Sequence, residues 1–376
     1  MDIISSILTG IPVFIILLGP LMFMHELGHF LAAKRAGIRV EEFGMGFPPR
    51  AATLFKRGDT TYSLNWLPIG AFVRMTGEED PSDPRSFAAQ PKRWRFITLF
   101  AGPAMNFVAA IVILFLAYLL FATRVTQGQY RINDVRPGSA AAQIGFQAGD
   151  VVLTANGVDM TQHVDPNSAN APSILPLKQQ AINSIGKTFT AEVLRRGPDG
   201  TQTQVQLKGV IPAGTNTDAP LGVTLSLVAS STERVYYTPL QAFSEAAVDG
   251  YTVLKSMVGV PIELIRGSIS LSQARPTGIV GITGIGVQLI SESNVQGLFP
   301  FIRFAGLLSM ILGLTNLLPI PALDGGRILF IVIEWVRGRR VDPVREQWVH
   351  GIGMVILLAL SAVIVVFDII RPVTLP

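Results

Sequence analysis

The sequence predicts an α-helical polytopic membrane protein with about four transmembrane helices, a small membrane-associated β-sheet and one inserted α+β domain. Hydrophobic residues make up 49% of the 376 residues and charged residues only 15%, whereas about 25% of the residues in soluble domains are charged. Four apolar runs, at residues 3–24, 96–123, 304–323 and 351–367, are long enough, or nearly so, to cross a bilayer. Between them lie two regions in which short alternating segments are separated by turn residues.

The composition also excludes several kinds of site. The chain has no cysteine, so disulfides and thiolate metal ligands are excluded and a metal ion would need His, Asp or Glu ligands. The net charge of +4 fits Lys and Arg residues that flank membrane helices better than a nucleic-acid site. No basic patch interleaved with aromatic residues indicates DNA or RNA binding, so we expect no nucleic acid among the partners.

The first apolar run ends in a sequence, Met22 to His29, that is typical of a metal site. His25 and His29 are one helical turn apart and can present two imidazoles to one Zn²⁺, with Glu26 beside them to accept a proton from water. Residues 3–24 carry no charge, and ionisable groups at the end of such a run are costly unless they have a function. The alternative, an ordinary helix end at the membrane surface, leaves this cost unexplained.

The distribution of basic residues predicts the orientation in the membrane. Eleven Lys and Arg residues lie between the first two apolar runs, and five lie between the last two. By the positive-inside rule both connections face the cytoplasm and both chain ends face outward. Residues 124–300 are then on the outer side.

The connection between the first two runs contains turn signals and short strand patterns. The stretch 44–49 is rich in Gly and Pro, and Arg57-Gly58-Asp59 is typical of a hairpin turn. Strands are predicted at residues 51–55, 60–66 and 71–75. We therefore expect a small sheet packed against the membrane helices.

A second alternating region begins near Gln127, where the composition changes sharply. Strands are predicted at residues 130–135, 150–155, 188–195, 201–210 and 222–227, with a short helix at 139–144. The runs 135–142 and 145–152, followed by Asn156-Gly157, resemble a bacterial PDZ domain. The resemblance implies an inserted α+β PDZ module, so peptide or substrate contact through this domain is a further expectation.

These features divide the chain into four parts. Residues 1–126 hold the first two transmembrane helices and the sheet, 127–229 form the PDZ domain, 230–299 form a connector, and 300–376 hold the last two transmembrane helices. In the connector, residues 238–266 have an amphipathic helical pattern, which is expected on the outer surface or against the PDZ domain. The Gly-rich segment 276–291 is too short to span and is interpreted as re-entrant or interfacial.

The third apolar run ends in two prolines and an acidic residue, Asp324. His25 follows Ile3 by 22 residues, roughly 33 Å of helix, and Asp324 follows Phe301 by 23 residues. Both segments are predicted to enter the bilayer from outside, so both arrive at its cytoplasmic side. His25, His29 and Asp324 can then share one metal ion and leave a fourth position for water. Asn106 is interpreted as a helix-packing residue, and His163 and His350 as solvated or interfacial.

Two motifs resemble the site-2 protease family of intramembrane zinc metalloproteases. They are His-Glu-Leu-Gly-His at residues 25–29 and the run Asn-x-x-Pro-x-Pro-x-Leu-Asp-Gly-Gly at residues 316–326. The likeness extends through residues 42–47, 68–75, 102–107 and 276–279 and so covers nearly the whole chain. The chain is similar to the bacterial regulator-of-sigma-E protease group with a single PDZ domain.

The resemblance implies a function and the residues that carry it. It assigns Zn²⁺ ligands His25, His29 and Asp324, the general base Glu26, and substrate-binding residues Asn316, Gly70 and Phe72. It implies an endopeptidase of the bacterial cytoplasmic membrane that cleaves transmembrane segments, such as a previously trimmed anti-sigma factor or remnant signal peptides. The partners are then transmembrane substrates and the lipid bilayer, with the PDZ domain outside as a size filter.

The residues alone leave three alternatives open. A membrane zincin of another family would take a Glu from a later helix as its third ligand. A non-enzymatic membrane PDZ scaffold would not need the histidines. A transporter would also bury polar residues in the membrane, but transporters usually show internal repeats, and we find none in this sequence.

Overall fold

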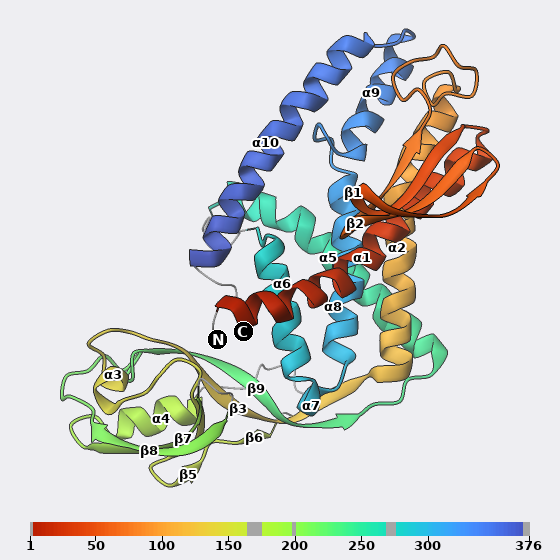
Figure 1. Ribbon diagram of the computed structural model, residues 1–376. Coiled ribbons are helices and arrows are strands. Elements are labelled where there is room, and N and C mark those ends of the chain that lie inside the picture. Colours follow the sequence, from red (N-terminus) through yellow and green to blue (C-terminus); the bar gives the residue numbers. More distant parts are fainter. Residues whose placement is uncertain (1–2, 164–174, 198–200, 268–275, 371–376) are drawn as a thin grey trace.

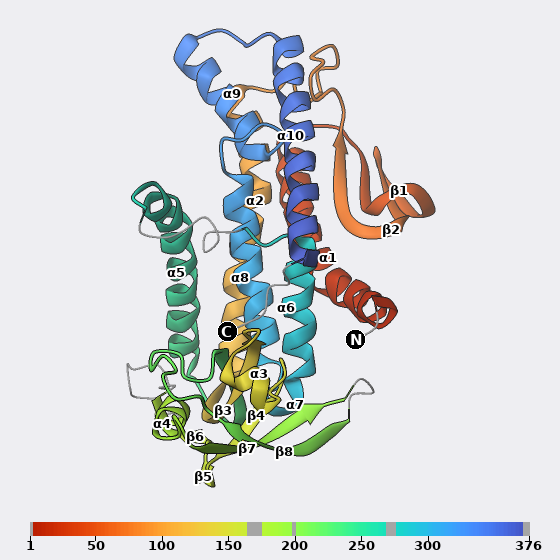
Figure 2. The ribbon, with the colours of Figure 1, turned by 90° about the vertical axis from the view of Figure 1, so that its left-hand side faces the viewer.

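The computed structural model describes residues 3–163, 175–197, 201–267 and 276–370. Long helices form the centre of the molecule, with a β-hairpin near one end and an α/β domain beyond the other (Figures 1 and 2). The helices are α1 (Ile3–Arg35), α2 (Lys92–Phe121), α3 (Ala140–Ile144), α4 (Leu175–Asn183), α5 (Pro239–Ile265), α6 (Ile279–Ser291), α7 (Ser293–Gln296), α8 (Phe299–Asn316), α9 (Asp324–Arg337) and α10 (Pro343–Ile370). The strands are β1 (Val40–Arg57), β2 (Thr60–Met75), β3 (Thr123–Val135), β4 (Val151–Ala155), β5 (Val158–Asp159), β6 (Gln162–His163), β7 (Thr188–Arg196), β8 (Gln202–Val210) and β9 (Val223–Arg234).

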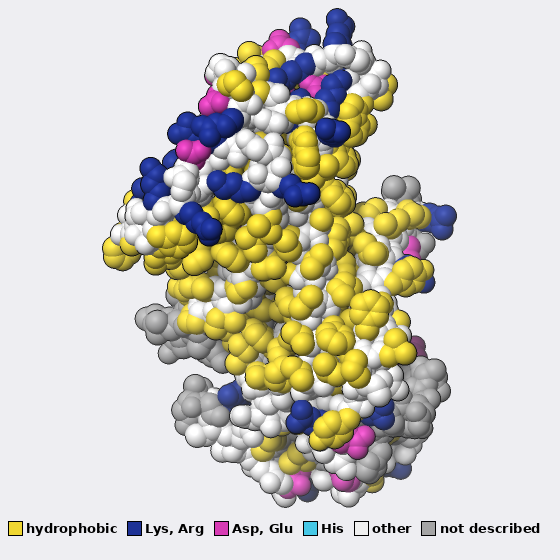
Figure 3. Space-filling view, turned by 90° about the vertical axis from the view of Figure 1, so that its right-hand side faces the viewer, with side chains coloured by type: hydrophobic (Ala, Val, Ile, Leu, Met, Phe, Trp, Pro, Cys, Tyr) yellow, Lys and Arg dark blue, Asp and Glu magenta, His cyan; other side chains and the backbone are white. Residues whose placement is uncertain are grey.

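Four helices of the described chain are long and apolar enough to cross a membrane, which confirms the predicted number of spans. They are α2, α8, α10 and the part of α1 from Gly10. Figure 3 shows a broad hydrophobic band across the middle of the molecule, with Lys and Arg side chains gathered toward one end. This distribution is typical of a protein whose middle lies in lipid and whose ends meet water.

Two helices end at other residues than the apolar runs that indicate them. α1 continues past residue 24 to Arg35, so both histidines lie inside the helix, as their spacing predicts. α8 ends at Asn316 rather than at residue 323. Pro319 and Pro321 favour the early end, because a proline removes a helical hydrogen bond and disfavours helical conformation in the residue before it.

The hairpin of β1 and β2 has more pairing than the sequence predicts. The three predicted strands lie within β1 and β2 and are confirmed, but the first part of β1 was predicted as a turn region. This part pairs on both sides, since Glu42 faces Arg74 and also Thr61. The strand was missed because Gly44 and Gly46 read as turn residues, whereas its stability comes from pairing with segments that are distant in sequence.

Glu42 is a buried charge within this sheet. Its side chain accepts hydrogen bonds from Ser63, Arg50 and Arg74 at 2.7, 2.6 and 2.7 Å. Burial by itself raises the pKa of Glu42, but these hydrogen bonds and charges hold the pKa below its usual value. The ionised carboxylate is therefore compensated and ties the segments of the sheet together.

The inserted domain, defined here as β3–β9, has its own hydrophobic core. The core includes Tyr130, Met160 and Phe189, which are fully buried. Each strand predicted in this region is found, as is the helix after Ser139, but β3 begins seven residues before the predicted strand and β9 ends seven residues after it. α4 was not predicted, and the predicted turn at residues 198–200 lies outside the described residues. The PDZ assignment and the boundaries at 127 and 229 stay predictions.

α5 packs on the membrane helices rather than on the inserted domain. Asp249 of α5 is buried and accepts hydrogen bonds from Tyr118 of α2 at 3.0 Å and from Arg303 of α8 at 2.6 and 2.7 Å. The amphipathic helix was predicted correctly, but both of the expected positions differ from this one. The charge pair explains the difference, because a buried carboxylate needs a cationic partner and Arg303 lies on α8.

The Gly-rich segment forms α6, which at 13 residues is too short to span a bilayer. α6 contacts α1, α8 and α10. Asp368, near the end of α10, accepts hydrogen bonds from the backbone N–H groups of Gly278 and Gly281 at 3.0 and 2.9 Å. A carboxylate in this position satisfies free N–H groups at a helix start and complements the helix dipole.

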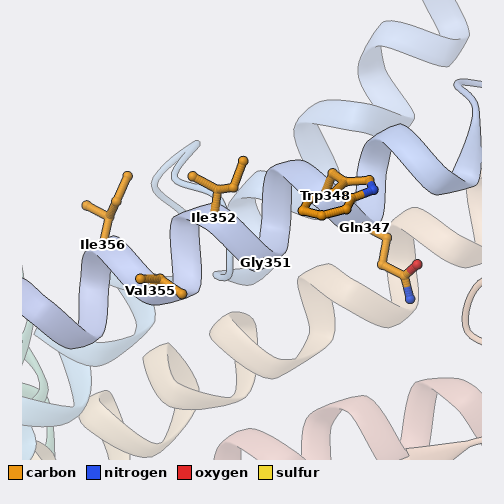
Figure 4. A pocket seen from close by; sticks show the side chains of 6 residues that line it. All are labelled: Gln347, Trp348, Gly351, Ile352, Val355 and Ile356. Carbon is orange, nitrogen blue, oxygen red and sulfur yellow. The ribbon is translucent and has the colours of Figure 1, made fainter.

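α10 exposes most of its apolar side chains. One hollow of about 440 Å³ is lined by α10 residues only: Gln347, Trp348, Gly351, Ile352, Val355 and Ile356 (Figure 4). None of the residues predicted for the metal site lines this hollow. An apolar helix face of this kind is expected to contact lipid.

Candidate active site

His25 and His29 project from the same face of α1, as positions four apart on a helix do. Their Nε2 atoms are 3.1 Å apart, and their rings meet at an angle of 84°. His29 is only 6% exposed. Two imidazoles therefore converge on one point inside the protein.

Asp324 opens α9, directly after the break that follows α8. Its Oδ2 lies 3.1 Å from Nε2 of His25 and 3.3 Å from Nε2 of His29. In the break, Ala322 has a φ of +74°, which few residues other than glycine adopt. The N–H of Ala322 donates a hydrogen bond of 2.9 Å to Nδ1 of His350 in α10. α10 thus supports the turn that directs Asp324 toward the histidines.

The three converging atoms fit a zinc ion. Ligand atoms at 2.0–2.2 Å from a tetrahedral zinc ion lie about 3.3–3.6 Å from one another. The distances among Nε2 of His25, Nε2 of His29 and Oδ2 of Asp324 are 3.1, 3.1 and 3.3 Å. Imidazole nitrogen and carboxylate oxygen are both common zinc ligands. Within the described ranges no second group of three metal-binding side chains converges in this way.

Each imidazole is also held through its other ring nitrogen. Nδ1 of His29 lies 2.8 Å from the backbone oxygen of Thr98. A carbonyl oxygen only accepts, so Nδ1 carries the proton and Nε2 is free to bind a metal. Nδ1 of His25 lies 3.2 Å from the side-chain amide nitrogen of Asn106. Such outer contacts are usual for metal-binding histidines, whose orientation they fix.

Gly102 of α2 makes room for the ring of His29. A Cβ at this position would lie 2.3 Å from Nε2 of His29, far inside van der Waals contact. We expect Gly102→Ala to displace the imidazole and to lower zinc affinity at least about tenfold, the lower range for disturbed metal-site supports. The measurement is zinc bound by the purified protein in competition with a chelator.

The matched control is Gly259→Ala in α5, where an added Cβ meets no atom within 4 Å. This variant is expected to bind zinc as the original chain does. Wild-type zinc affinity in Gly102→Ala would mean that His29 does not need its present position.

Glu26 lies between the histidines and the edge of the sheet. Its carboxylate accepts a hydrogen bond from the backbone N–H of Val73 in β2. Val73 faces Phe43 of β1 on one side, and no other described strand pairs with β2 there. The carboxylate of Glu26 and an open strand edge are therefore adjacent.

The residues predicted to bind substrate lie on two different elements. Gly70 is next to α1, since a Cβ there would lie 2.9 Å from the end of the Met22 side chain. Phe72 covers Gly44 of the neighbouring strand and lines a cavity of about 380 Å³ on the sheet. Asn316 is the last residue of α8, at the start of the break that leads to Asp324. Their binding role stays a prediction.

The sequence analysis missed three residues that support the converging group. Thr98 acts through its backbone oxygen, so no residue type at that position reveals it. His350 holds the break before α9 and is not simply interfacial. Asn106 contacts His25 in addition to packing between helices. The sequence offers one signal for Asn106. It is a polar amide within an apolar helix, where such a side chain needs a hydrogen-bond partner.

Comparison with known proteins gives a consistent result. The family described as Peptidase family M50 matches residues 13–360 of the chain. The zinc metalloprotease RasP of Geobacillus kaustophilus is 29% identical over 95% of this chain and 96% of its own length. A putative zinc metalloprotease of Campylobacter jejuni is 30% identical over 93% and 90% of the two chains. The regulator of sigma-W protease RasP of Bacillus subtilis is 27% identical over 95% and 97%.

Proposed function

Because the chain belongs to peptidase family M50, the site-2 proteases, and is thus a zinc metalloprotease, we propose that it cleaves transmembrane segments of other membrane proteins. The observation that carries the proposal is the convergence of His25, His29 and Asp324 within 3.1–3.3 Å. We propose these three residues as the zinc ligands and Glu26 as the general base. Family membership argues against a scaffold, a transporter and a zincin of another family.

The proposed reaction is hydrolysis of a peptide bond. When bound, a zinc ion supplies Lewis-acid chemistry and lowers the pKa of water to about 7 in well-studied sites. Glu26 accepts the proton of the attacking water and passes it to the leaving amine nitrogen. The hydroxyl group joins the carbonyl carbon while the carbon–nitrogen bond breaks, so the products are one carboxylate and one amine. The hydrogen bond from Val73 keeps the carboxylate of Glu26 beside the sheet edge.

A transmembrane helix must unwind locally before this reaction, because its carbonyl groups are hydrogen-bonded within the helix. The edge of β2 near Val73 offers backbone groups to which an extended segment can add as a further strand. Gly70 and Phe72 belong to this edge region. Together with Asn316 they are the residues that we propose to contact the substrate.

The substrate class is proposed from the chemistry and from one relative. The Bacillus subtilis relative is named a regulator of sigma-W protease, which supports regulated intramembrane proteolysis of a substrate such as a previously trimmed anti-sigma factor. Remnant signal peptides present the same short transmembrane form. In this proposal the inserted domain is a PDZ domain that contacts substrate or excludes long extracytoplasmic parts.

The test of the function uses the purified full chain in liposomes with a single-span model substrate. We expect mass spectrometry to find product ends inside the transmembrane segment, with cleavage abolished by a zinc chelator and restored by added Zn²⁺. Cleavage confined to soluble parts of the substrate, at the same rate without the transmembrane segment, would contradict the proposal.

The orientation is proposed from the basic residues and from the placement of the elements. The bacterial relatives and four candidate spans fit a multi-pass protein of the bacterial inner membrane. α9 and the hairpin of β1 and β2 lie toward one end of the helices, and β3–β9 lies beyond the other end (Figures 1 and 2). With the basic connections inside, the inserted domain is outside.

Single cysteines test this orientation, since the chain has none of its own. In intact cells, Asp59→Cys and Gly338→Cys are expected to be shielded from an impermeant thiol reagent, whereas Lys208→Cys in β8 is expected to react. All three should react once the membrane is permeabilised. Labelling of the first two in intact cells would overturn the proposed orientation.

A further inference from the structure

Asn106 contacts the ring of His25 at the nitrogen opposite to the one that faces Asp324. Asn106 is 1% exposed, and its Nδ2 is 3.2 Å from Nδ1 of His25. The other ring nitrogen, Nε2, lies 3.1 Å from Oδ2 of Asp324. The imidazole is therefore held from both sides, by α2 and by the start of α9.

Metal binding determines which nitrogen of His25 carries its proton. A nitrogen that binds a metal must keep its lone pair free, so a neutral imidazole that uses Nε2 carries its hydrogen on Nδ1. His29 has this arrangement, because its Nδ1 faces the backbone oxygen of Thr98 at 2.8 Å. By the same argument His25 needs a hydrogen-bond acceptor at Nδ1.

The side-chain amide of Asn106 can supply this acceptor. Its oxygen and nitrogen have nearly the same shape, and a half-turn of the amide exchanges them. Oδ1 is buried and has no hydrogen-bond partner among the described residues, so the exchange breaks no bond on that side. On the side of the amide away from His25, one atom has no partner in either orientation. The contact with Nδ1 of His25 therefore decides which orientation is favoured.

We propose that Asn106 is a positioning residue of the metal site, in which Oδ1 accepts a hydrogen bond from Nδ1–H of His25. This contact fixes the tautomer and the ring orientation of His25 as a zinc ligand. The proposal rests on the proposed zinc site and deepens it.

The backbone around Asn106 is held in a way that suits this role. The hydroxyl of Ser309 in α8 donates a hydrogen bond of 2.9 Å to the backbone oxygen of Asn106. α8 also approaches closely at Gly313, where a Cβ would lie 3.2 Å from Cβ of Asn106. The helix that leads to Asp324 thus also sets the position of the amide behind His25.

The experiment compares zinc affinity among variants of the purified full chain, measured by competition with a chelator. Asn106→Leu keeps the approximate volume but removes the acceptor, and we expect zinc affinity to fall about 10- to 100-fold, as for other outer contacts of metal-binding histidines. Asn106→Asp keeps an acceptor oxygen, so its affinity should stay within a few-fold of wild type or increase. Gly259→Ala in α5, where an added Cβ meets no atom within 4 Å, should bind zinc as wild type does.

Two outcomes would overturn the proposal. One is wild-type zinc affinity in Asn106→Leu. The other is an equal loss in Asn106→Leu and Asn106→Asp, which would indicate packing at this position rather than an acceptor. If Asn106→Leu does not fold, Asn106→Ala provides the same comparison with Asn106→Asp. Failure of the zinc site itself is distinguishable, because wild type and Asp324→Asn would then bind zinc equally.

Discussion

Glu26→Gln is expected to keep the fold and the bound zinc while the rate of peptide hydrolysis falls by roughly 10²–10⁴-fold, the usual contribution of a general acid–base group. Glutamine has the shape of glutamate, and its side-chain oxygen can still accept the hydrogen bond that Val73 donates to Glu26. It cannot accept a proton from water at neutral pH. The measurement is the initial rate of substrate cleavage together with the zinc content of the same sample.

Glu79→Gln is the matched control, because Glu79 is an exposed glutamate outside the converging group. Its rate is expected to equal that of the original chain. A near-normal rate in zinc-loaded Glu26→Gln would remove Glu26 from the mechanism. Loss of zinc together with activity would instead assign Glu26 a role in holding the histidines.

The features that the sequence predicts well depend on residues close together in the chain. The four spans follow from apolar length alone, and the pairing of His25 with His29 follows from helical spacing. The first part of β1 was missed for the opposite reason. Gly44 and Gly46 favour a turn locally, but this segment is a strand because it pairs with two parts of β2.

The same distinction applies to the candidate site. Asp324 was joined to the histidines by an argument from membrane depth, which locates a residue along a helix but not around it. Asn106 and His350 were not assigned to the site, because their contacts depend on how α2 and α10 are rotated toward α1 and the break before α9. That rotation is set by packing over the whole bundle, so no local pattern reports it.

Asp324→Asn is expected to lower zinc affinity by more than roughly 100-fold, the upper range for outer contacts, because Asp324 is proposed as a direct ligand. The variant keeps the shape of the side chain but loses the negative charge that balances Zn²⁺. Its amide nitrogen would also bring hydrogens toward Nε2 of His25 and His29, which now lie 3.1 and 3.3 Å from Oδ2. Zinc content and cleavage rate, measured on the same sample, test this expectation.

Two further variants show whether the effect belongs to the position of the carboxylate. Asp324→Glu keeps the charge but adds a methylene group, which moves the oxygen by more than the tolerance of about 0.2 Å in metal–ligand distances. We therefore expect partial zinc binding with little activity. Asp342→Asn, at an exposed aspartate in the loop before α10, should bind zinc and cleave substrate normally. Stoichiometric zinc in Asp324→Asn would mean that the third ligand lies elsewhere and that the two halves of the chain do not share this site.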